Sequence, residues 1–446
     1  MSHQDVAAEL AKCKQRWYPL KDHPQQLGMI RAIDPKAGVR FVVTPAGRRS
    51  GKTERVKRYF AKLAMRAPGA RLVLAAPTRD QAKKIFWQDI KLLTFSPAHR
   101  KEPSESELTV YLPNGSTISV VGLDKPQRIE GIPIDGLGID EVADLKPGAW
   151  ENHILPALNT FDPTRPDYRP FCYLFGVPDY AGSEYHKLYE SAKRDPEYAT
   201  FHWKSAEILP PDIIESARRK MSPLAFKVEF EASFETVGTG RIYPDYGDEH
   251  ACDSTLRPEE PILWCHDFNY TPLCSAICVK RDGAYHVVDE IVLESAVARH
   301  AADEFLDRYA GHQYKTVYLY GDASGRAGEK HSLESMYTVI EDVLRRAGWT
   351  VTRRVPHANP PIRERQEALR AAIKSAAGDI SFYVNPGRAE WVHLGLSTVQ
   401  YMAGSSFQED AKNEYHHITT ALGYMLAYDR PVVNGGIQRK RYRGKT

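Results

Sequence analysis

The sequence predicts an α/β protein that contains two domains. Its 446 residues are too many for one ordinary hydrophobic core, so two domains of roughly 200 residues each are expected. Between about residues 40 and 180, short apolar runs alternate with helical stretches, which is typical of a mostly parallel sheet covered on both faces. After residue 258, strand-like runs follow one another directly, which indicates an antiparallel sheet in a second domain.

The first half of the chain alternates strands and helices. A strand, a helix, a strand and a helix are predicted in VRFVVTP (39–45), TERVKRYFAKLAMRA (53–67), ARLVLAAPT (70–78) and RDQAKKIFWQDIKLL (79–93). Three further strands are predicted in TISVVG (117–122), IDGLGIDEV (134–142) and RPFCYLFGVP (169–178). Repeated strand–helix order favours parallel pairing, because parallel neighbours need a crossover connection.

The loop after the first strand reads TPAGRRSGKT (44–53). A phosphate-binding loop has glycine, four residues, then Gly-Lys-Ser/Thr, and here Ala46 stands at the first glycine position with Gly47 one place later. In such a strand–loop–helix context, backbone N–H groups cradle phosphate, Lys52 reaches the β/γ oxygens and Thr53 offers its hydroxyl to Mg²⁺. The predicted nucleotide-binding residues of the loop are Gly47, Ser50, Gly51, Lys52 and Thr53.

A second motif supplies acids that complement the phosphate loop. The apolar strand GLGIDE (136–141) ends in two acids. Asp140 can hold Mg²⁺ through its water shell, and Glu141 can orient and deprotonate an attacking water. Two acids at the start of a helix are a common alternative, but the phosphate loop upstream argues against it.

Three arginines are candidates for stabilising charge on a transferred phosphoryl group. Arg48 and Arg49 lie within the loop, and Arg128 precedes the strand of the two acids. Arginine fingers act in this way in other phosphate-loop enzymes. A plain surface role is the open alternative for each of the three.

The second domain opens with three strands, ILWCHDFNY (262–270), LCSAICVKR (273–281) and AYHVVDEIVL (284–293). The Asp282-Gly283 pair between two of them indicates a hairpin, so the three form an antiparallel meander. A helix (295–310), a strand (316–322) that returns parallel to the sheet, a helix and a strand (349–355) follow, and then helices at 362–377, 388–403 and near 415–428. This is the order of the ribonuclease H fold.

Composition is that of a soluble globular protein, with 26% charged and 42% apolar residues. We expect an intracellular protein without a membrane span, because no apolar run approaches the ~20 residues that a bilayer requires and no secretory leader is visible. The net charge is only +3, yet basic clusters at 48–58, 345–354 and 438–445 suit contact with phosphates. Solvated surface charge is the alternative.

From about residue 20 to 430, the chain resembles the large terminase subunits of tailed double-stranded DNA bacteriophages. The motifs that carry the resemblance are HPQQ (23–26), AGRRSGKT (46–53), LVLAAPTRDQAKKIFW (72–87), RIEGIPIDGLGIDE (128–141), FGVP (175–178) and FKVEFEASFET (226–236). The resemblance implies that Gln26 contacts adenine and that FGVP couples hydrolysis to DNA movement. It also implies a loop that tolerates loss of the first glycine.

The family's activity sets the functional expectation. It implies an ATPase that uses ATP and Mg²⁺ to drive double-stranded DNA into the procapsid, and an endonuclease with two Mg²⁺ or Mn²⁺ ions that cuts the concatemeric genome. Implied partners are DNA, the portal protein, the small terminase subunit and other copies in a ring on the portal, in the host cytoplasm. Alternatives are a helicase-like ATPase–nuclease of repair or recombination, and a non-catalytic DNA-binding or docking protein.

Two acids are predicted for the nuclease site. Asp267 lies in the first strand of the second domain and Asp322 ends the fourth, and these strands are neighbours in the ribonuclease H fold. Nucleases of this fold hold two metal ions between carboxylates. A buried strand aspartate without a partner is costly, which argues against a structural role for both.

The third metal ligand departs from the family pattern. The last helix of the family typically begins with histidine, followed after a short stretch by Asp-Ala, whereas here Thr420 precedes Ala421. Threonine cannot replace a carboxylate as a charged ligand. Asp410 is the favoured substitute, His417 (the match to the family histidine) is the second choice, and Glu290 is another option. A weakened or differently metallated nuclease stays open.

The expected domain boundaries follow from these assignments. We expect an N-terminal ATPase domain of the ASCE phosphate-loop type over residues 1–235 and a Gly/Pro/Tyr-rich linker over 236–258. A ribonuclease H-like nuclease domain over 259–430 and a basic tail over 431–446 complete the chain.

Overall fold

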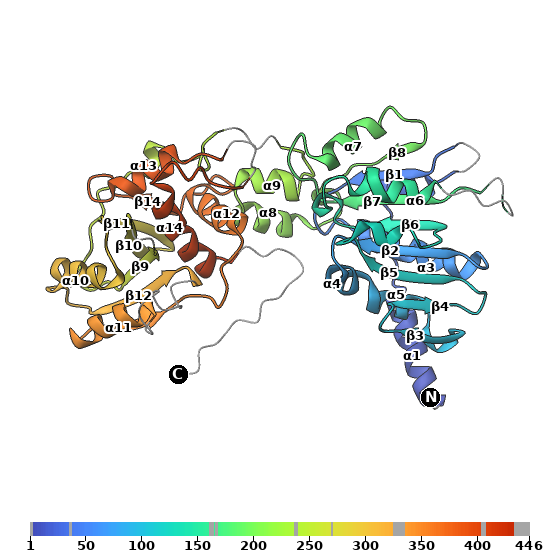
Figure 1. The fold of residues 1–446 in the computed structure, drawn as a ribbon, viewed down its shortest axis with the longest axis horizontal. Helices are drawn as coiled ribbons and strands as arrows, with labels where there is room; N and C mark the ends of the chain where they lie inside the picture. The colour runs from blue at the N-terminus through green and yellow to red at the C-terminus, as the bar shows by residue number, and fades with distance from the viewer. Residues whose placement is uncertain are drawn as a thin grey trace. The chain divides into compact units, whose positions relative to one another are not determined.

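The computed structural model describes residues 3–34, 38–159, 165, 168–235, 240–268, 271–323, 335–402 and 407–431. The expected basic tail therefore lies outside the described residues, apart from Pro431. The chain divides into two compact units, Met1–Ile214 with Lys227–Thr236, and Glu215–Phe226 with Val237–Thr446 (Figure 1). This division assigns 215–226 and 237–258 to the second unit, whereas the sequence analysis expects the first domain to extend to 235 and a separate linker to follow it.

The described part of the first unit contains an eight-stranded sheet, in the order β3-β4-β5-β2-β6-β7-β1-β8. The six strands from β5 to β8 in this order pair in parallel, and β3 and β4 form an antiparallel edge that the sequence analysis did not predict. The strands are β1 Phe41–Pro45, β2 Arg71–Ala76, β3 Lys101–Ser104, β4 Thr109–Tyr111, β5 Thr117–Gly122, β6 Gly136–Ile139, β7 Phe171–Gly176 and β8 Tyr198–Thr200. The prediction of a mostly parallel sheet is confirmed.

Helices cover both faces of this sheet, as the alternation of side chains in β1 shows. Val42 packs in one buried cluster with Phe60 of α3, whereas Phe41 and Val43 pack in another with Trp150. The helices are α1 His3–Arg16, α2 Pro24–Arg31, α3 Lys52–Arg66, α4 Arg79–Ala82, α5 Gln88–Leu93, α6 Leu155–Leu158 and α7 Glu184–Ala192. A π-helical segment, Lys83–Trp87, joins α4 to α5, so the predicted helix over 79–93 is confirmed as one helical stretch.

The strand order places the two predicted motifs at one edge of the sheet. β7 lies between β1, which leads into the phosphate loop, and β6, which leads into the acids. All three are parallel, so their carboxyl ends meet at the same edge, where α/β proteins bind ligands.

The described part of the second unit contains a six-stranded sheet, in the order β13-β12-β9-β10-β11-β14. β9, β10 and β11 form the predicted antiparallel meander, and β12 returns parallel to β9. The turn between β10 and β11 has positive φ at both Asp282 (47°) and Gly283 (84°), as a two-residue hairpin requires. The strands are β9 Ile262–Asp267, β10 Leu273–Arg281, β11 Ala284–Leu293, β12 Thr316–Gly321, β13 Thr350–Arg353 and β14 Phe382–Val384.

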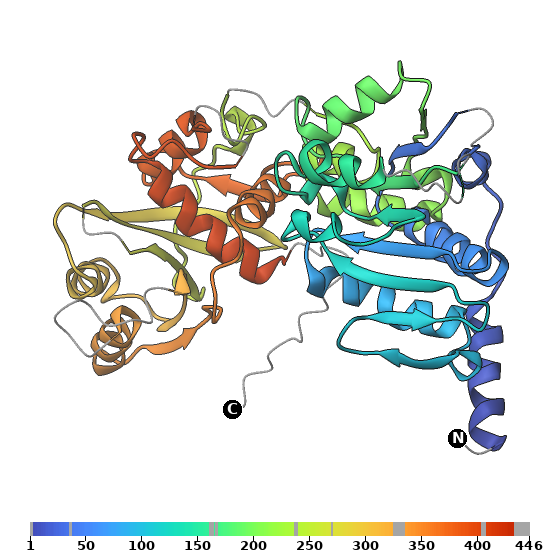
Figure 2. The same ribbon diagram turned by 45° about the vertical axis from the view of Figure 1, so that its right-hand side comes forward.

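Two layers of helices enclose the second sheet. α10 Ala298–Tyr309 and α11 Met336–Arg346 share one buried cluster with the sheet, while α12 Ile362–Ile373, α13 Glu390–Thr398 and α14 His416–Asp429 share the other. α14 contacts β9, β10 and β12, and Figure 2 shows it lying across the strands. The ribonuclease H-like order is confirmed, although α12 and α13 are shorter than expected and β14 was not predicted.

Two further helices, α8 Pro211–Lys220 and α9 Pro223–Glu229, lie in the part of the chain that the division between the two units cuts. None of the helices in the described residues is both long and apolar enough to cross a membrane.

Candidate active sites

The phosphate loop links β1 to α3 at the carboxyl edge of the first sheet. Gly51, at the start of α3, has a φ of 83°, and Arg49 has a φ of 56°. Lys52 is buried, with its Nζ atom 3.3 Å from the Ala46 carbonyl oxygen and 3.2 Å from that of Gly47. Burial lowers the pKa of Lys52, and the charge of Asp140 opposes this shift.

The displaced glycine of the loop has a packing reason. A Cβ atom at Gly47 would lie 2.3 Å from Ser205 Oγ and 2.8 Å from the Phe230 carbonyl oxygen. The N–H group of Gly47 donates to the Trp203 carbonyl oxygen at 3.0 Å. Gly47 therefore lets the loop pack directly against residues 203–205.

The structure brings the two motifs of the first unit together. Thr53 Oγ1 donates a hydrogen bond of 2.7 Å to Asp140 Oδ2, across the end of the sheet. Asp140 is buried, which raises its pKa, while the charge of Lys52 opposes this. A hydroxyl and a carboxylate in contact beside a buried lysine are a donor set that fits a nucleotide with its Mg²⁺.

Glu141 follows Asp140 with a φ of 57° and is half-buried. Gln81 Nε2 donates to its Oε2 atom at 3.1 Å, so a residue of α4 orients the carboxylate. Burial raises the pKa of Glu141, and the charges of Asp140 and Asp144 add to the increase. A raised pKa makes this carboxylate a stronger proton acceptor, which suits a general base.

Gln26 supports the loop from α2. Its Nε2 atom donates to the Ser50 carbonyl oxygen at 2.6 Å, and its Oε1 atom accepts from Arg55 Nε at 2.8 Å. Ser50 Oγ in turn donates to the Gly47 carbonyl oxygen at 2.5 Å. Contact of Gln26 with adenine stays a prediction.

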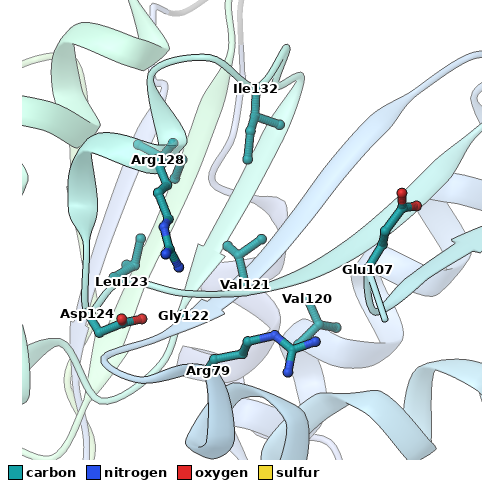
Figure 3. A pocket seen from close by; sticks show the side chains of 10 residues that line it. Arg79, Glu107, Val120, Val121, Gly122, Leu123, Asp124, Arg128 and Ile132 are labelled. Carbon is teal, nitrogen blue, oxygen red and sulfur yellow. The ribbon is translucent and has the colours of Figure 1, made fainter. Parts of the chain in front are cut away.

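The three candidate arginines have different surroundings. Arg48 pairs with Glu229 through both guanidinium Nε and Nη2, the latter at 2.8 Å from Oε1. Arg49 is exposed. Arg128 is exposed and lines a hollow of about 180 Å³ at the end of β5, together with Arg79 and Asp124 (Figure 3). Within the described part of the chain, the guanidinium of Arg128 makes no hydrogen bond or ion pair, which leaves this group available to another molecule.

The predicted acids of the second unit lie on neighbouring strands. β9 and β12 pair in parallel with Gly321 opposite His266, so Asp322 and Asp267 follow on adjacent strands. Asp322 is 7% exposed. His417 Nδ1, from the first turn of α14, lies 2.9 Å from Asp267 Oδ2. The structure thus places Asp267, Asp322 and His417 at one edge of the sheet.

A pocket of about 360 Å³ lies in front of Asp267; its lining residues are Asp267, Ile362, Arg365, Met402, Gln408, Glu409, His416, His417, Thr420 and Tyr424. Among the residues that the structure describes, no three His, Cys, Asp or Glu side chains are close enough together to hold a metal ion. The two neighbouring aspartates nevertheless suit divalent cations, which prefer oxygen ligands.

Glu409, and not its neighbour Asp410, faces this pocket. Asp410 Oδ1 accepts from the Lys412 N–H at 3.1 Å, and Asp410 is not part of the lining. Glu409 Oε2 accepts from Thr420 Oγ1 at 3.1 Å, and Oε1 accepts from Gln366 Nε2 at 3.0 Å. The backbone of Glu409 pairs with that of Tyr401, and neighbouring side chains of an extended segment point to opposite sides.

Glu290, the other acid considered, stabilises the start of α13. Its two carboxylate oxygens accept from the N–H groups of Trp391 at 2.8 Å and Val392 at 3.0 Å. Burial raises its pKa to about 7, and the two N–H groups oppose this increase. It does not line the pocket.

Comparisons with known proteins agree with this architecture. Residues 44–245 match the family model described as terminase large subunit, T4likevirus-type, N-terminal. A solved large terminase from a thermophilic bacteriophage has a TM-score of 0.63 at 14% identity, over 92% of this chain and 99% of that chain. The complex of that terminase with ATP-gamma-S gives 0.61 at 15% identity, over 91% and 98%. No curated protein sequence matches the chain.

The fold and the two sites define the class of the protein, a phosphate-loop domain followed by a ribonuclease H-like domain. Residues 44–245 match the N-terminal part of the large terminase subunits of tailed phages, and the fold over both units is similar to that of a solved large terminase.

The packing around Gly47 yields a prediction. Gly47→Ala should force the loop away from Ser205, lower the free energy of unfolding by about 1–3 kcal/mol and weaken nucleotide binding. Thermal unfolding and titration with a non-hydrolysable ATP analogue measure the two effects. Gly131→Ala is the matched control, because a Cβ atom there would meet no atom within 4 Å. Equal behaviour of the two variants would contradict the packing role.

Proposed function

We propose that this chain is the motor ATPase and nuclease of viral DNA packaging, with ATP hydrolysis in the first unit and DNA cutting in the second. One observation carries the proposal: the Thr53–Asp140 hydrogen bond joins a phosphate loop to an acid-bearing strand, in a chain whose second unit aligns Asp267 with Asp322. The likeness to the thermophilic phage terminase over both units favours this role over a helicase-like repair enzyme, because it includes the nuclease fold.

The roles in the first unit follow from position. ATP with Mg²⁺, when bound, supplies the phosphoryl group and the cation that neutralises its charge. Lys52 would contact the phosphates, and Thr53 and Asp140 would hold the cation. Glu141, oriented by Gln81, would accept the proton of the attacking water.

The roles in the second unit centre on two carboxylates. Divalent metal ions, when bound, supply the activated water and the charge stabilisation that phosphodiester cleavage requires. Asp267 and Asp322 would hold the ions, and His417 would orient the Asp267 carboxylate. Glu409 is the acid best placed to supply the charge that the family aspartate provides and Thr420 does not, because Thr420 contacts it directly.

The expected partners are part of the same proposal. Double-stranded DNA is the substrate of both units, and the portal protein, the small terminase subunit and further copies in a ring complete the motor in the host cytoplasm. The exposed guanidinium of Arg128 supports the ring, since it suits insertion into the nucleotide site of a neighbouring copy.

The two activities should separate by mutation. Glu141→Gln or Lys52→Ala should lower ATP hydrolysis by at least about 100-fold and abolish packaging, while metal-dependent cutting of plasmid persists. Asp267→Asn should abolish cutting and spare ATP hydrolysis. Phosphate release and gel assays measure the two reactions. If a variant of either unit lost both ATP hydrolysis and DNA cutting, the assignment of one activity to each unit would be wrong.

A mixing experiment tests the role of Arg128. Arg128→Ala and Lys52→Ala subunits should each be inactive alone, and their mixture should recover part of the ATP hydrolysis, because each intact site would receive an arginine from its neighbour. Arg79→Ala, from the same hollow, is the control variant. No recovery in the mixture would count against action between copies.

The adjacent acids Glu409 and Asp410 form a matched pair. Glu409→Gln should reduce cutting at least about tenfold and weaken Mn²⁺ binding in calorimetry, because only Glu409 faces the pocket. Asp410→Asn should leave both near the wild-type values. A larger loss of cutting and of Mn²⁺ binding in Asp410→Asn than in Glu409→Gln would instead support Asp410 as the third ligand.

A further inference from the structure

Arg365 of α12 places a cation at the pocket of the second unit. Its Nε and Nη1 atoms are buried and have no hydrogen-bond partner among the described residues. Its guanidinium stacks on the ring of Tyr424, 4.4 Å from the centroid, and lines the pocket with Asp267, His417 and Glu409. None of the roles assigned above uses this group.

A guanidinium with buried, unsatisfied N–H groups is expensive to maintain. Arginine stays charged in proteins, and an uncompensated buried charge costs several kcal/mol. Stacking on an aromatic ring stabilises the guanidinium by only about 0.5–2 kcal/mol. The cost indicates a site that is completed by an anion.

The neighbouring acids form hydrogen bonds with groups other than this cation. Both carboxylate oxygens of Glu409 accept hydrogen bonds, from Gln366 and Thr420, and Asp267 is bonded to His417. The position of Arg365 is fixed as well, because α12 packs so closely on α14 that a Cβ atom at Gly423 would lie 3.2 Å from Arg365 Cβ. The guanidinium thus lines the pocket without a carboxylate partner among the described residues.

We propose that Arg365 binds a backbone phosphate of the DNA strand that enters the nuclease pocket. The guanidinium is planar and matches phosphate oxygens with paired N–H donors. With Asp267 and Glu409 in the same pocket, the cation supplies the positive charge that draws a polyanion toward an acidic site. This inference rests on the proposed nuclease function.

The test compares Arg365→Met with Arg363→Met in the full chain, by the rate of cutting of a duplex DNA with Mg²⁺ at several salt concentrations. Arg363 is an exposed arginine of the same helix, so the two variants lose the same charge. Arg365→Met should lower kcat/KM at least about tenfold, and the slope of log(kcat/KM) against log salt should flatten by about 0.9, the value for one phosphate contact. Arg365→Lys should recover part of the loss, and Arg363→Met should resemble the wild type.

Stability separates this role from a structural one. Arg365→Met should unfold at the same temperature as the wild type or higher, because it removes two buried N–H groups that have no partner and nearly keeps the volume. Cutting and salt slope equal to those of the wild type would overturn the proposal. A lower melting temperature with no recovery in Arg365→Lys would also overturn it, in favour of packing. Failure of the nuclease function itself is distinct, since the wild type would then cut no better than Asp267→Asn.

Discussion

The hydrogen bond from Thr53 to Asp140 is the contact on which the chemistry proposed for the first unit depends. It joins residues 87 positions apart, and it forms because β1, β7 and β6 are parallel neighbours whose carboxyl ends share one edge. Lys52 and Asp140 are buried beside it with opposite charges, and burial disfavours the charged form of each. Parallel pairing thus assembles a charged site that neither motif could hold alone.

The second unit applies the same geometry to a different chemistry. Parallel pairing of β9 and β12 places Asp267 and Asp322 at the ends of neighbouring strands, whereas the first unit places a lysine beside an acid. Neighbouring carboxylates favour bound cations, whereas a buried lysine favours a bound anion. Helix α14 adds His417 and Thr420 across the strand ends, and Thr420 contacts the acid Glu409 from a segment outside the helix.

Most of the architecture could be predicted from sequence, because strong local signals mark it. The Asp282-Gly283 turn, the phosphate loop and the strand ends at Asp140, Asp267 and Asp322 all carry such signals. What was missed depends on tertiary contacts. β14 is three residues long, and it pairs with β11 and, through Val384, with Ala251. The choice between Glu409 and Asp410 depends on the backbone pairing with Tyr401, and the role of Gly47 depends on Ser205, which lies far along the chain.

The proposed nuclease function of the second unit requires metal ions held by Asp267, Asp322 and a substitute acid. Anomalous diffraction from crystals of the full chain soaked in Mn²⁺ tests this most directly. The account predicts Mn²⁺ peaks between Asp267 and Asp322, with a Glu409 oxygen within the ~2–2.6 Å of a metal–oxygen bond. Mn²⁺ bound by Asp410 or Glu290, or an absence of Mn²⁺ at Asp267, would contradict it.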